Sequence, residues 1–417
     1  MKPALRVKDV ERITLRVPFT ERVRRWNALL VWQWQIVEII RVTTDDGSVG
    51  YGEPLPHYTW GKVSDEAIER VRGSNPAELL GDDSLGAGLQ MAIYDVVGKA
   101  LEVPVHRLFN LGKVRDWCPI AWWNTKMSPE DLAGEAQDAV RDGYIFHKFK
   151  TRPWFDVYEQ VEAISAVTPP HYRLDMDWNG MLMNVGTAVP VMQRLDQYER
   201  VSIYEGPINQ ADVEGQRELR RKVAKPIALH FGSPPFQTAV REAVCDGFVI
   251  GGGVSAVLRQ GQLAGEFEKP FWLQMVGVGL VTALSAHLGA VLPFAQWPTI
   301  TCMNNYTDQL LNEPLTICGW YLQVPDGPGL GVEVNEDALM KYAMEEPYQL
   351  PDERHILSVV WQGGRVVHFA NMKDHCWPHF RQRGNDPAQE PGVTLEIWDD
   401  DGSKQWNDLY TRLQRGP

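Results

Sequence analysis

The stretch YIFHKFK, residues 144–150, reads as a buried strand up to its last three residues, where two lysines flank a phenylalanine. Side chains two positions apart on a strand point to the same side, so Lys148 and Lys150 face one way together. Two neighbouring cations on a largely apolar strand repel each other and are costly to remove from water. Alone, such a pair is more often an exposed strand edge, so its meaning depends on the neighbouring strands.

A repeating unit extends from this strand in both directions: a short apolar run, a turn, then a helical pattern. Successive strand ends at Lys150, Asp177, Glu205 and His230 are separated by 25 to 28 residues. Alternating strands and helices at this spacing form a parallel sheet with right-handed crossovers. Seven or eight such units over roughly 210 residues favour a closed barrel over an open sheet. The helices of these units are predicted near 128–143, 154–167, 184–197, 210–223, 235–244 and 253–266.

The barrel is expected over residues 116–325, with a further segment on each side. Residues 1–115 read as an α+β capping domain, because 6–55 has an antiparallel pattern with a DDG turn and 64–109 is helical. Residues 326–417 begin with a Pro/Gly-rich segment that returns to the cap and continue into an extension. The extension includes a predicted hairpin at 355–369, and we expect it to pack on the cap or on a neighbouring subunit.

Composition excludes several classes of protein. The 417 residues are 44% hydrophobic and 23% charged, which is ordinary for a soluble globular protein, and the net charge of −13 argues against nucleic acid as a partner. The N-terminus lacks the pattern of a signal peptide, and no run of about 18 apolar residues predicts a membrane span. Five scattered cysteines without a CxxC pair fit neither a disulfide framework nor a zinc site, so we expect a cytoplasmic protein with reduced thiols.

Polar residues gather at the predicted strand ends, where a parallel barrel places its active site. Lysines that face carboxylates around one ring suit two tasks, holding a divalent metal through oxygens and moving a proton. Each residue alone has a structural explanation, such as a turn cap or a satisfied core histidine, but their common register favours a site. Besides the lysine pair, the candidates along the chain are Asp175, Asp177, Asn179, Glu205, His230, Asp246 and Gln274.

These motifs resemble those of the enolase superfamily, in its mandelate racemase and muconate lactonizing branch. The resemblance covers nearly the whole chain down to about residue 345. No single motif is diagnostic, but the ordered set is. It includes GSVGYGEP (47–54) for the capping domain, HKFK (147–150) for the KxK motif, DMDWNG (175–180) for D-x-N-G and IYEGPI (203–208) for E-x-P. CDGFVIGGGVSAVL (245–258), SAHL (285–288) and VPDGPGLGVEV (324–334) resemble the segments that follow.

The resemblance implies an α/β fold, a (β/α)7β-type TIM barrel with an α+β capping domain. It also implies an enzyme that abstracts the proton α to a carboxylate. Asp177 and Glu205 would hold Mg²⁺, Lys150 would be the base and Lys148 its electrostatic partner. Asp246 falls where racemase-like members keep the aspartate of an Asp–His dyad.

Several positions depart from the family pattern. The third metal carboxylate should fall at or beside Phe231, where this chain has His230, a softer ligand for Mg²⁺, so Mg²⁺ is a weakened expectation. Asp175 could replace that carboxylate only if it reaches up from deeper in the barrel. The dyad histidine is missing from 274–279, Val249 replaces the lysine of lactonizing members, and Pro298-Thr299 replaces an eighth-strand acid. A familiar racemase or cycloisomerase is therefore not expected.

Three functions remain open. We favour a dehydratase of a sugar acid or similar hydroxy acid, with Lys150 as base and His230 or Asp246 as acid, because β-elimination needs one base and one acid. The second is a metal-independent or altered-chemistry isomerase or lyase acting on a carboxylate. The third is a non-catalytic relative that binds a small acid.

The expected partner is a small-molecule carboxylate, without nucleic acid or membrane, and the resemblance implies a homo-oligomer. Aromatic and polar residues of the capping loops suit a carboxylate attached to a ring or a polyol. An equally good explanation is aromatic residues buried between cap and barrel. The predicted substrate-binding residues are Trp26, His57, Tyr58, Asn179 and Gln274.

Overall fold

The computed structural model describes residues 5–58, 61–345, 347–350, 354–383 and 389–416, and the chain divides into two compact units. Unit 1 combines Met1–Thr20, Gln33–Ala121 and Phe248–Gln349, and unit 2 combines Glu21–Trp32, Trp122–Gly247 and Leu350–Pro417. Each unit is therefore assembled from segments that are distant in the sequence.

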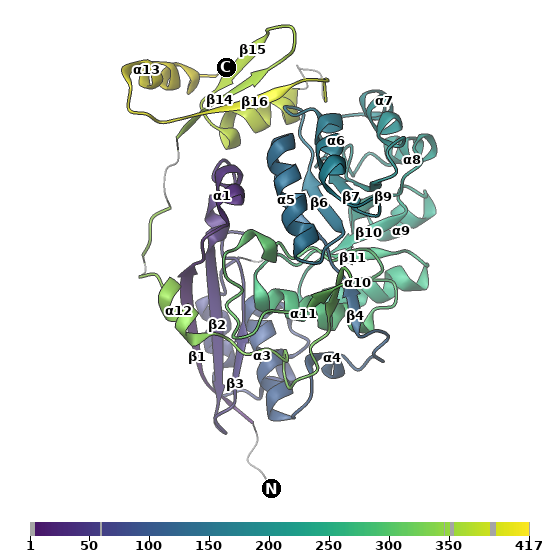
Figure 1. The fold of residues 1–417 in the computed structure, drawn as a ribbon. Helices are drawn as coiled ribbons and strands as arrows, with labels where there is room; N and C mark the ends of the chain where they lie inside the picture. Colours follow the sequence, from purple (N-terminus) through teal and green to yellow (C-terminus); the bar gives the residue numbers. More distant parts are fainter. Residues whose placement is uncertain (1–4, 59–60, 346, 351–353, 384–388, 417) are drawn as a thin grey trace. The chain divides into compact units, whose positions relative to one another are not determined.

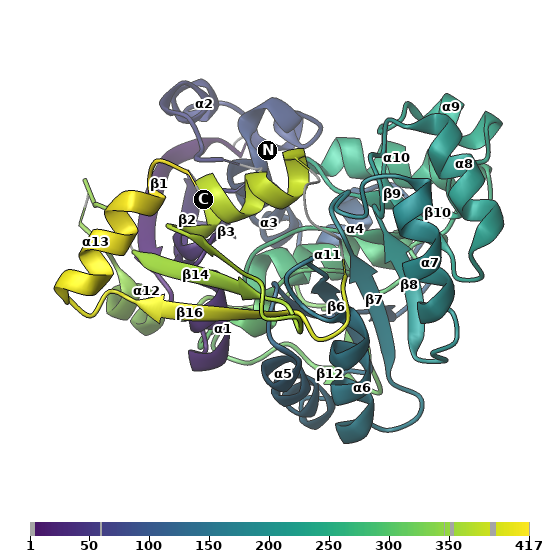
Figure 2. The ribbon, with the colours of Figure 1, turned by 90° about the horizontal axis from the view of Figure 1, so that it is seen from above.

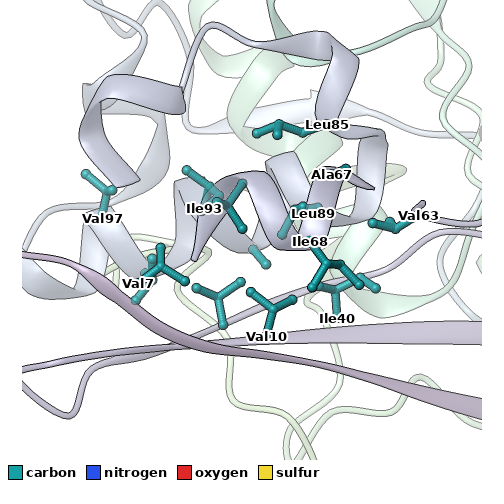
Figure 3. Packing of buried hydrophobic residues seen from close by; sticks show 14 residues of the cluster. Val7, Val10, Ile40, Val63, Ala67, Ile68, Leu85, Leu89, Ile93 and Val97 are labelled. Atoms are coloured by element: carbon teal, nitrogen blue, oxygen red, sulfur yellow. The ribbon is translucent and has the colours of Figure 1, made fainter. Parts of the chain in front are cut away.

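Unit 1 contains an antiparallel sheet with the order β1-β2-β3, formed by Val7–Arg16, Ile36–Thr44 and Val49–Gly52. Apolar residues of this sheet and of helix α3 (Ala87–Ala100) form a buried cluster, which Figure 3 shows from close by. Strand β3 lies close against α3 because it carries glycine: a Cβ at Gly52 would lie 1.9 Å from the carbonyl oxygen of Gly88. The antiparallel and helical elements predicted for residues 6–109 are thus confirmed.

The last segment of unit 1, Phe248–Gln349, carries the last parallel strands of the chain. Strand β10 (Gly247–Ile250) pairs in parallel with β11 (Phe271–Leu273). Helix α10 (Val254–Glu266) connects them, and α11 (Gly279–Val291) follows β11. The other elements of unit 1 are α2 (Asp65–Val71), η2 (Pro76–Leu79), η3 (Asp83–Leu85), α4 (Val105–Leu108), β4 (Trp117–Pro119), η4 (Met303–Asn305), β12 (Ile317–Cys318), β13 (Tyr321–Gln323) and α12 (Glu336–Tyr342).

The prediction of a closed barrel is wrong for the strands that the described residues form, because the parallel sheet curls without closing. The segment around Thr299, where an eighth strand was expected, forms isolated parallel bridges in place of a strand, from Thr299 to Ile120 and from Ile300 to Gln274. Backbone hydrogen bonds from Thr299 to Pro119 and from Ile300 to Leu273 accompany them. Pro298 precedes these residues, and proline has no N–H to donate to a ladder of backbone hydrogen bonds. A continuous closing strand is therefore interrupted at its start.

Unit 2 is built on parallel strands in the order β9-β8-β7-β6-β5, each followed by a helix (Figures 1 and 2). Neighbours in the sheet are also consecutive in the chain, as the repeat predicted. The strands are β5 (Trp122–Asn124), β6 (Phe146–Lys150), β7 (Arg173–Asp177), β8 (Val201–Glu205) and β9 (Ile227–His230). The helices are α5 (Pro129–Arg141), α6 (Val157–Val167), α7 (Val185–Leu195), α8 (Val213–Lys222) and α9 (Phe236–Arg241), and α1 (Glu21–Asn27) also belongs to this unit.

Local sequence sets the starts of these helices. Ser128 caps α5, its side chain accepting a hydrogen bond from the backbone N–H of Asp131, and Pro129 occupies the first turn. Asp156 caps α6 in the same way, accepting from Tyr158 and Glu159. These caps set the residue at which each strand-to-helix loop ends and each helix begins. They therefore set the length of the loops that follow the strands.

Residues 354–416, here called the C-terminal module, also belong to unit 2. An antiparallel sheet with the order β15-β14-β16 carries helix α13 (Lys404–Leu413), as Figure 1 shows. The predicted hairpin is confirmed, since β14 (His355–Val360) pairs with β15 (Val366–Phe369) across a glycine turn. The remaining elements are η5 (Met372–Cys376), η6 (His379–Arg383) and β16 (Thr394–Asp399).

Candidate active site

The ends of four neighbouring strands bring the central predicted residues together. Lys150, Asp177, Glu205 and His230 are the last residues of β6, β7, β8 and β9, and parallel neighbours end at the same edge of a sheet. The Lys148 ammonium forms an ion pair with Glu205 and lies 3.7 Å from Asp177 Oδ2. The Lys150 ammonium pairs with the same oxygen of Asp177. The two lysines therefore face two carboxylates across adjacent strands.

Burial separates the roles that the two lysines can take. The side chains of Lys148, Asp177 and Glu205 are fully buried, whereas 17% of the Lys150 side chain is exposed. Burial opposes the ionisation of Glu205, but the charge of Lys148, aided by His230 and Lys150, outweighs it and holds the pKa of Glu205 well below its usual range. Lys148 can thus stabilise negative charge only from within the sheet, whereas Lys150 can contact a ligand that binds at the strand ends.

His230 is the most open member of the group. Its Nε2 lies 3.1 Å from Glu205 Oε1, and 41% of its side chain is exposed. Its backbone N–H donates to the side-chain oxygen of Gln210 at 2.7 Å, which anchors the end of β9. A carboxylate behind an imidazole holds the ring in one orientation, so this pair is placed to exchange a proton with a ligand. Sequence reasoning missed Gln210, because nothing marks a loop glutamine as a partner of the next strand.

Asp175 lies deeper in the sheet than Asp177, as expected. It stands beside Lys148 in the strand register, and its carboxyl is buried with no hydrogen-bond partner among the described residues. Burial raises the pKa of Asp175 to about 7, Lys148 opposing and Glu205 reinforcing this effect. Asp175 is therefore protonated well below pH 7, and its role as the missing carboxylate ligand stays a prediction.

Asn179 forms part of a clamp at the end of β7. Its backbone is left-handed (φ 49°), which asparagine tolerates, and its N–H donates to Asp177 Oδ1 at 2.9 Å. Its side-chain oxygen accepts from the Arg152 guanidinium at 2.6 Å. Arg152 also donates to the backbone oxygens of Thr151 and Asp177, at 2.5 and 3.1 Å. The resemblance gave no role to Arg152, although its position two residues after Lys150 could have drawn attention to it.

The structure does not bring Asp246 into this group. Asp246 precedes β10, at the amino ends of the strands, where it pairs with Arg220 at 2.7 Å and accepts the backbone N–H of Ile227 at 2.9 Å. His230, on the same strand as Ile227, lies at the opposite end. Asp246 therefore ties α8 to the sheet, and we leave it out of the proposed chemistry.

The predicted substrate-binding residues of the cap are engaged with other side chains. Trp26 is buried in unit 2, where its indole N–H donates to Asp131 and its ring meets Phe155 edge-on at 5.5 Å. In unit 1, His57 Nε2 lies 2.7 Å from the Tyr348 hydroxyl, and Tyr58 packs against Trp34. Gln274, also in unit 1, makes the bridge to Ile300. The substrate contacts of these residues stay predictions.

The side chains at the strand ends do not fit a Mg²⁺ cage. The described part of the chain contains no group of three or more His, Cys, Asp or Glu side chains placed to hold a metal. Asp177 and Glu205 are each paired with a lysine, and His230 occupies the remaining side of Glu205. Mg²⁺ requires near-octahedral oxygen ligands, which this set does not provide. We therefore derive no chemical step through a metal.

Comparisons with known proteins agree with the motifs. Residues 131–338 match the family model described as enolase C-terminal domain-like. The chain is 25% identical to D-gluconate dehydratase of Thermoproteus tenax over 394 residues, covering 83% of this chain and 75% of that protein. It is 26% identical to muconate cycloisomerase 1 of Pseudomonas putida over 372 residues, covering 81% and 98%. Arabinonate dehydratase of Saccharolobus solfataricus is 23% identical over 336 residues, covering 72% and 89%.

Solved structures support the same fold. Muconate lactonizing enzyme from Pseudomonas fluorescens in complex with muconolactone superposes with a TM-score of 0.68 at 22% identity, covering 82% of this chain and all of that one. N-succinyl Arg/Lys racemase from Bacillus cereus gives a TM-score of 0.67 at 19% identity, covering 82% and 98%.

In the described residues, no helix is long and apolar enough to cross a membrane.

Proposed function

The chain belongs to the enolase superfamily, and on this premise we propose that it is a lyase that removes water from a sugar acid or a similar small hydroxy acid. Its relatives include dehydratases, racemases and cycloisomerases. The observation that carries the proposal is the arrangement at the strand ends. A lysine pair faces Asp177 and Glu205, and a Glu205-bound His230 stands on the open side.

The charges around the strand ends suit one substrate carboxylate. While Lys150 still carries its proton, Lys148, Lys150 and Arg152 contribute three positive charges against the two carboxylates Asp177 and Glu205, and Asp175 is neutral well below pH 7. One excess positive charge in a largely buried site attracts an anion more strongly than it would in water. The substrate carboxylate thus supplies the charge that completes the site.

In the proposed reaction Lys150, after losing its proton to solvent, takes the proton on the carbon next to the carboxylate. This step leaves an enediolate with two negative charges, which the Lys148 ammonium stabilises from below. Lys150 has the exposure that this role requires, and Lys148, which is fully buried, does not.

His230 then donates a proton to the hydroxyl on the β carbon. The C–O bond breaks, water leaves, and the resulting enol becomes a keto acid. Glu205 Oε1, 3.1 Å from the ring, orients the imidazole for this transfer. One proton is taken and one is given, so the net change is the loss of water and every step uses side chains of this chain.

The test is a screen of sugar acids and other hydroxy acids for dehydration, with and without a chelator. Keto-acid formation that survives the chelator and disappears in Lys150→Met supports the proposal. Turnover to an isomer of the same mass would indicate the isomerase alternative, with Lys150 and His230 as bases on two faces. Turnover that stops with chelator would refute the metal-independent steps. No turnover across a broad library, together with specific binding of an acid, would leave the non-catalytic relative.

Four finer features of the family pattern are also part of this proposal. We propose that the parallel strands form a (β/α)7β-type barrel domain that is not fully closed, and that the chain also has an α+β capping domain, with the boundaries predicted from the sequence. We further propose that Mg²⁺, if it associates, does so weakly. A cytoplasmic location and a homo-oligomeric state remain proposals that follow from composition and from the family.

A further inference from the structure

The C-terminal module contacts the segment that directly follows the lysine-bearing strand β6. The Trp377 ring lies 4.7 Å from the guanidinium carbon of Arg152, a cation–π geometry. Trp154, which is fully buried, meets Trp377 at 6.3 Å and Phe380 at 5.4 Å between ring centroids. The sequence led us to expect packing on the cap or on another subunit, but the module instead packs on this segment of its own unit.

Backbone hydrogen bonds fix the same contact at a second point. The N–H of Asp156 donates to the carbonyl oxygen of Val393 at 3.2 Å, and the N–H of Gly392 donates to the Asp156 carboxylate at 2.8 Å. Asp156 is also the N-cap of α6. The module thus holds both ends of the segment 152–156, through aromatic packing at one end and hydrogen bonds at the other.

Arg152 connects this contact to the active site. Its side chain is buried, and its guanidinium bridges the backbone oxygens of Thr151 and Asp177 and the side chain of Asn179. Burial lowers the pKa of Arg152 to about 10, so the group stays charged at neutral pH. A planar guanidinium with several fixed donors ties its acceptors together in one geometry, which a lysine could not do.

We propose that the C-terminal module positions the catalytic lysine: Trp377 holds Arg152, and Arg152 holds together the ends of β6 and β7 that carry Lys150 and Asp177. The inference rests on the proposed function, because Lys150 is the base there. Trp377 and Arg152 act as positioning residues through backbone contacts. Displacing a catalytic group by about 1 Å can cost a hundredfold in rate, so a module outside the barrel can control activity.

The test uses the full-length chain with Trp377→Leu, which keeps an apolar side chain at a half-buried position but removes the aromatic face. Trp377→Phe restores a ring. Trp398→Leu is the matched control, because Trp398 is also half-buried in the same module but packs against the cluster that contains Trp406. Two readouts need no substrate: hydrogen exchange of the amides of 149–156, and the rate of reductive methylation of Lys150, both measured by mass spectrometry.

We expect Trp377→Leu to raise both rates about fivefold, the change expected from losing one partly buried cation–π contact. Trp377→Phe should recover most of the difference and Trp398→Leu should leave both rates unchanged. For an acid that the wild-type protein dehydrates, kcat should fall in Trp377→Leu while KM changes little. Unchanged exchange and methylation in Trp377→Leu, or equal changes in Trp398→Leu, would overturn the inference. If the wild-type protein dehydrates none of the acids, the proposed function fails, and the exchange and methylation rates still decide whether the module positions Lys150.

Discussion

Replacing Lys148 by methionine should destabilise the protein far more than the same change at Lys150. Lys148 is fully buried, forms an ion pair with Glu205 and lies 3.7 Å from Asp177. Its removal leaves the buried Glu205 carboxylate with His230, at 3.1 Å, as its remaining ion-pair partner among the described residues. Breaking one side of a buried ion pair costs about 3–5 kcal/mol of unfolding free energy. At Lys150, which is partly exposed, the expected cost is about 1 kcal/mol.

Urea denaturation followed by circular dichroism at pH 7.5 measures both costs. The double variant Lys148→Met/Glu205→Gln should recover most of the loss, because it removes both charges. The pKa of Glu205 is lowered in the folded state, so its ionised form contributes stability above the unfolded value of 4.5, and this stability is lost as the pH falls. The penalty of Lys148→Met should therefore shrink below pH 4.5. A Lys148→Met cost below about 1 kcal/mol, or no recovery in the double variant, would refute the buried pair.

Two further predictions concern a buried lysine and the metal. Burial, with the nearby charge of Arg152, lowers the pKa of Lys126 from 10.5 to about 7, so the unfolded state binds more protons between these values. Lys126→Met should therefore be more stable than wild type at pH 7, by at most about 5 kcal/mol of unfolding free energy. Denaturation measured at rising pH should show that this advantage vanishes near pH 10.5. A stability advantage that does not change with pH would contradict the burial effect. Calorimetric titration should show no saturable Mg²⁺ binding at millimolar concentrations, because both carboxylates are paired with lysines; saturable binding that Asp177→Asn abolishes would contradict it.

The repeat spacing predicted the strands and the main site residues because it reports geometry directly. A 25- to 28-residue period places consecutive strand ends on one edge, so Lys150, Asp177, Glu205 and His230 could be grouped before any coordinates were known. The grouping of these side chains is confirmed, and their chemical roles stay predictions.

The sequence was less informative where contacts depend on distant segments. Asp246 was assigned by resemblance, although it stands before its strand rather than after it, and its partner Arg220 comes from the preceding helix. The role of Arg152 depends on Trp377, more than 200 residues further along the chain, and no periodicity relates the two. The closed barrel was wrongly predicted because closure depends on the backbone pairing around Thr299 and Ile300, which an apolar pattern does not report.

The most direct test of the central claim is deuterium exchange at the carbon next to the carboxylate, followed by NMR in D₂O. An acid that the wild-type protein dehydrates is incubated with His230→Asn and, separately, with Lys150→Met. The account predicts that His230→Asn incorporates deuterium at this carbon without eliminating water, because the base remains and the acid is gone. Lys150→Met should give neither exchange nor elimination. Exchange that persists in Lys150→Met, or elimination at the wild-type rate in His230→Asn, would contradict the assignment of base and acid.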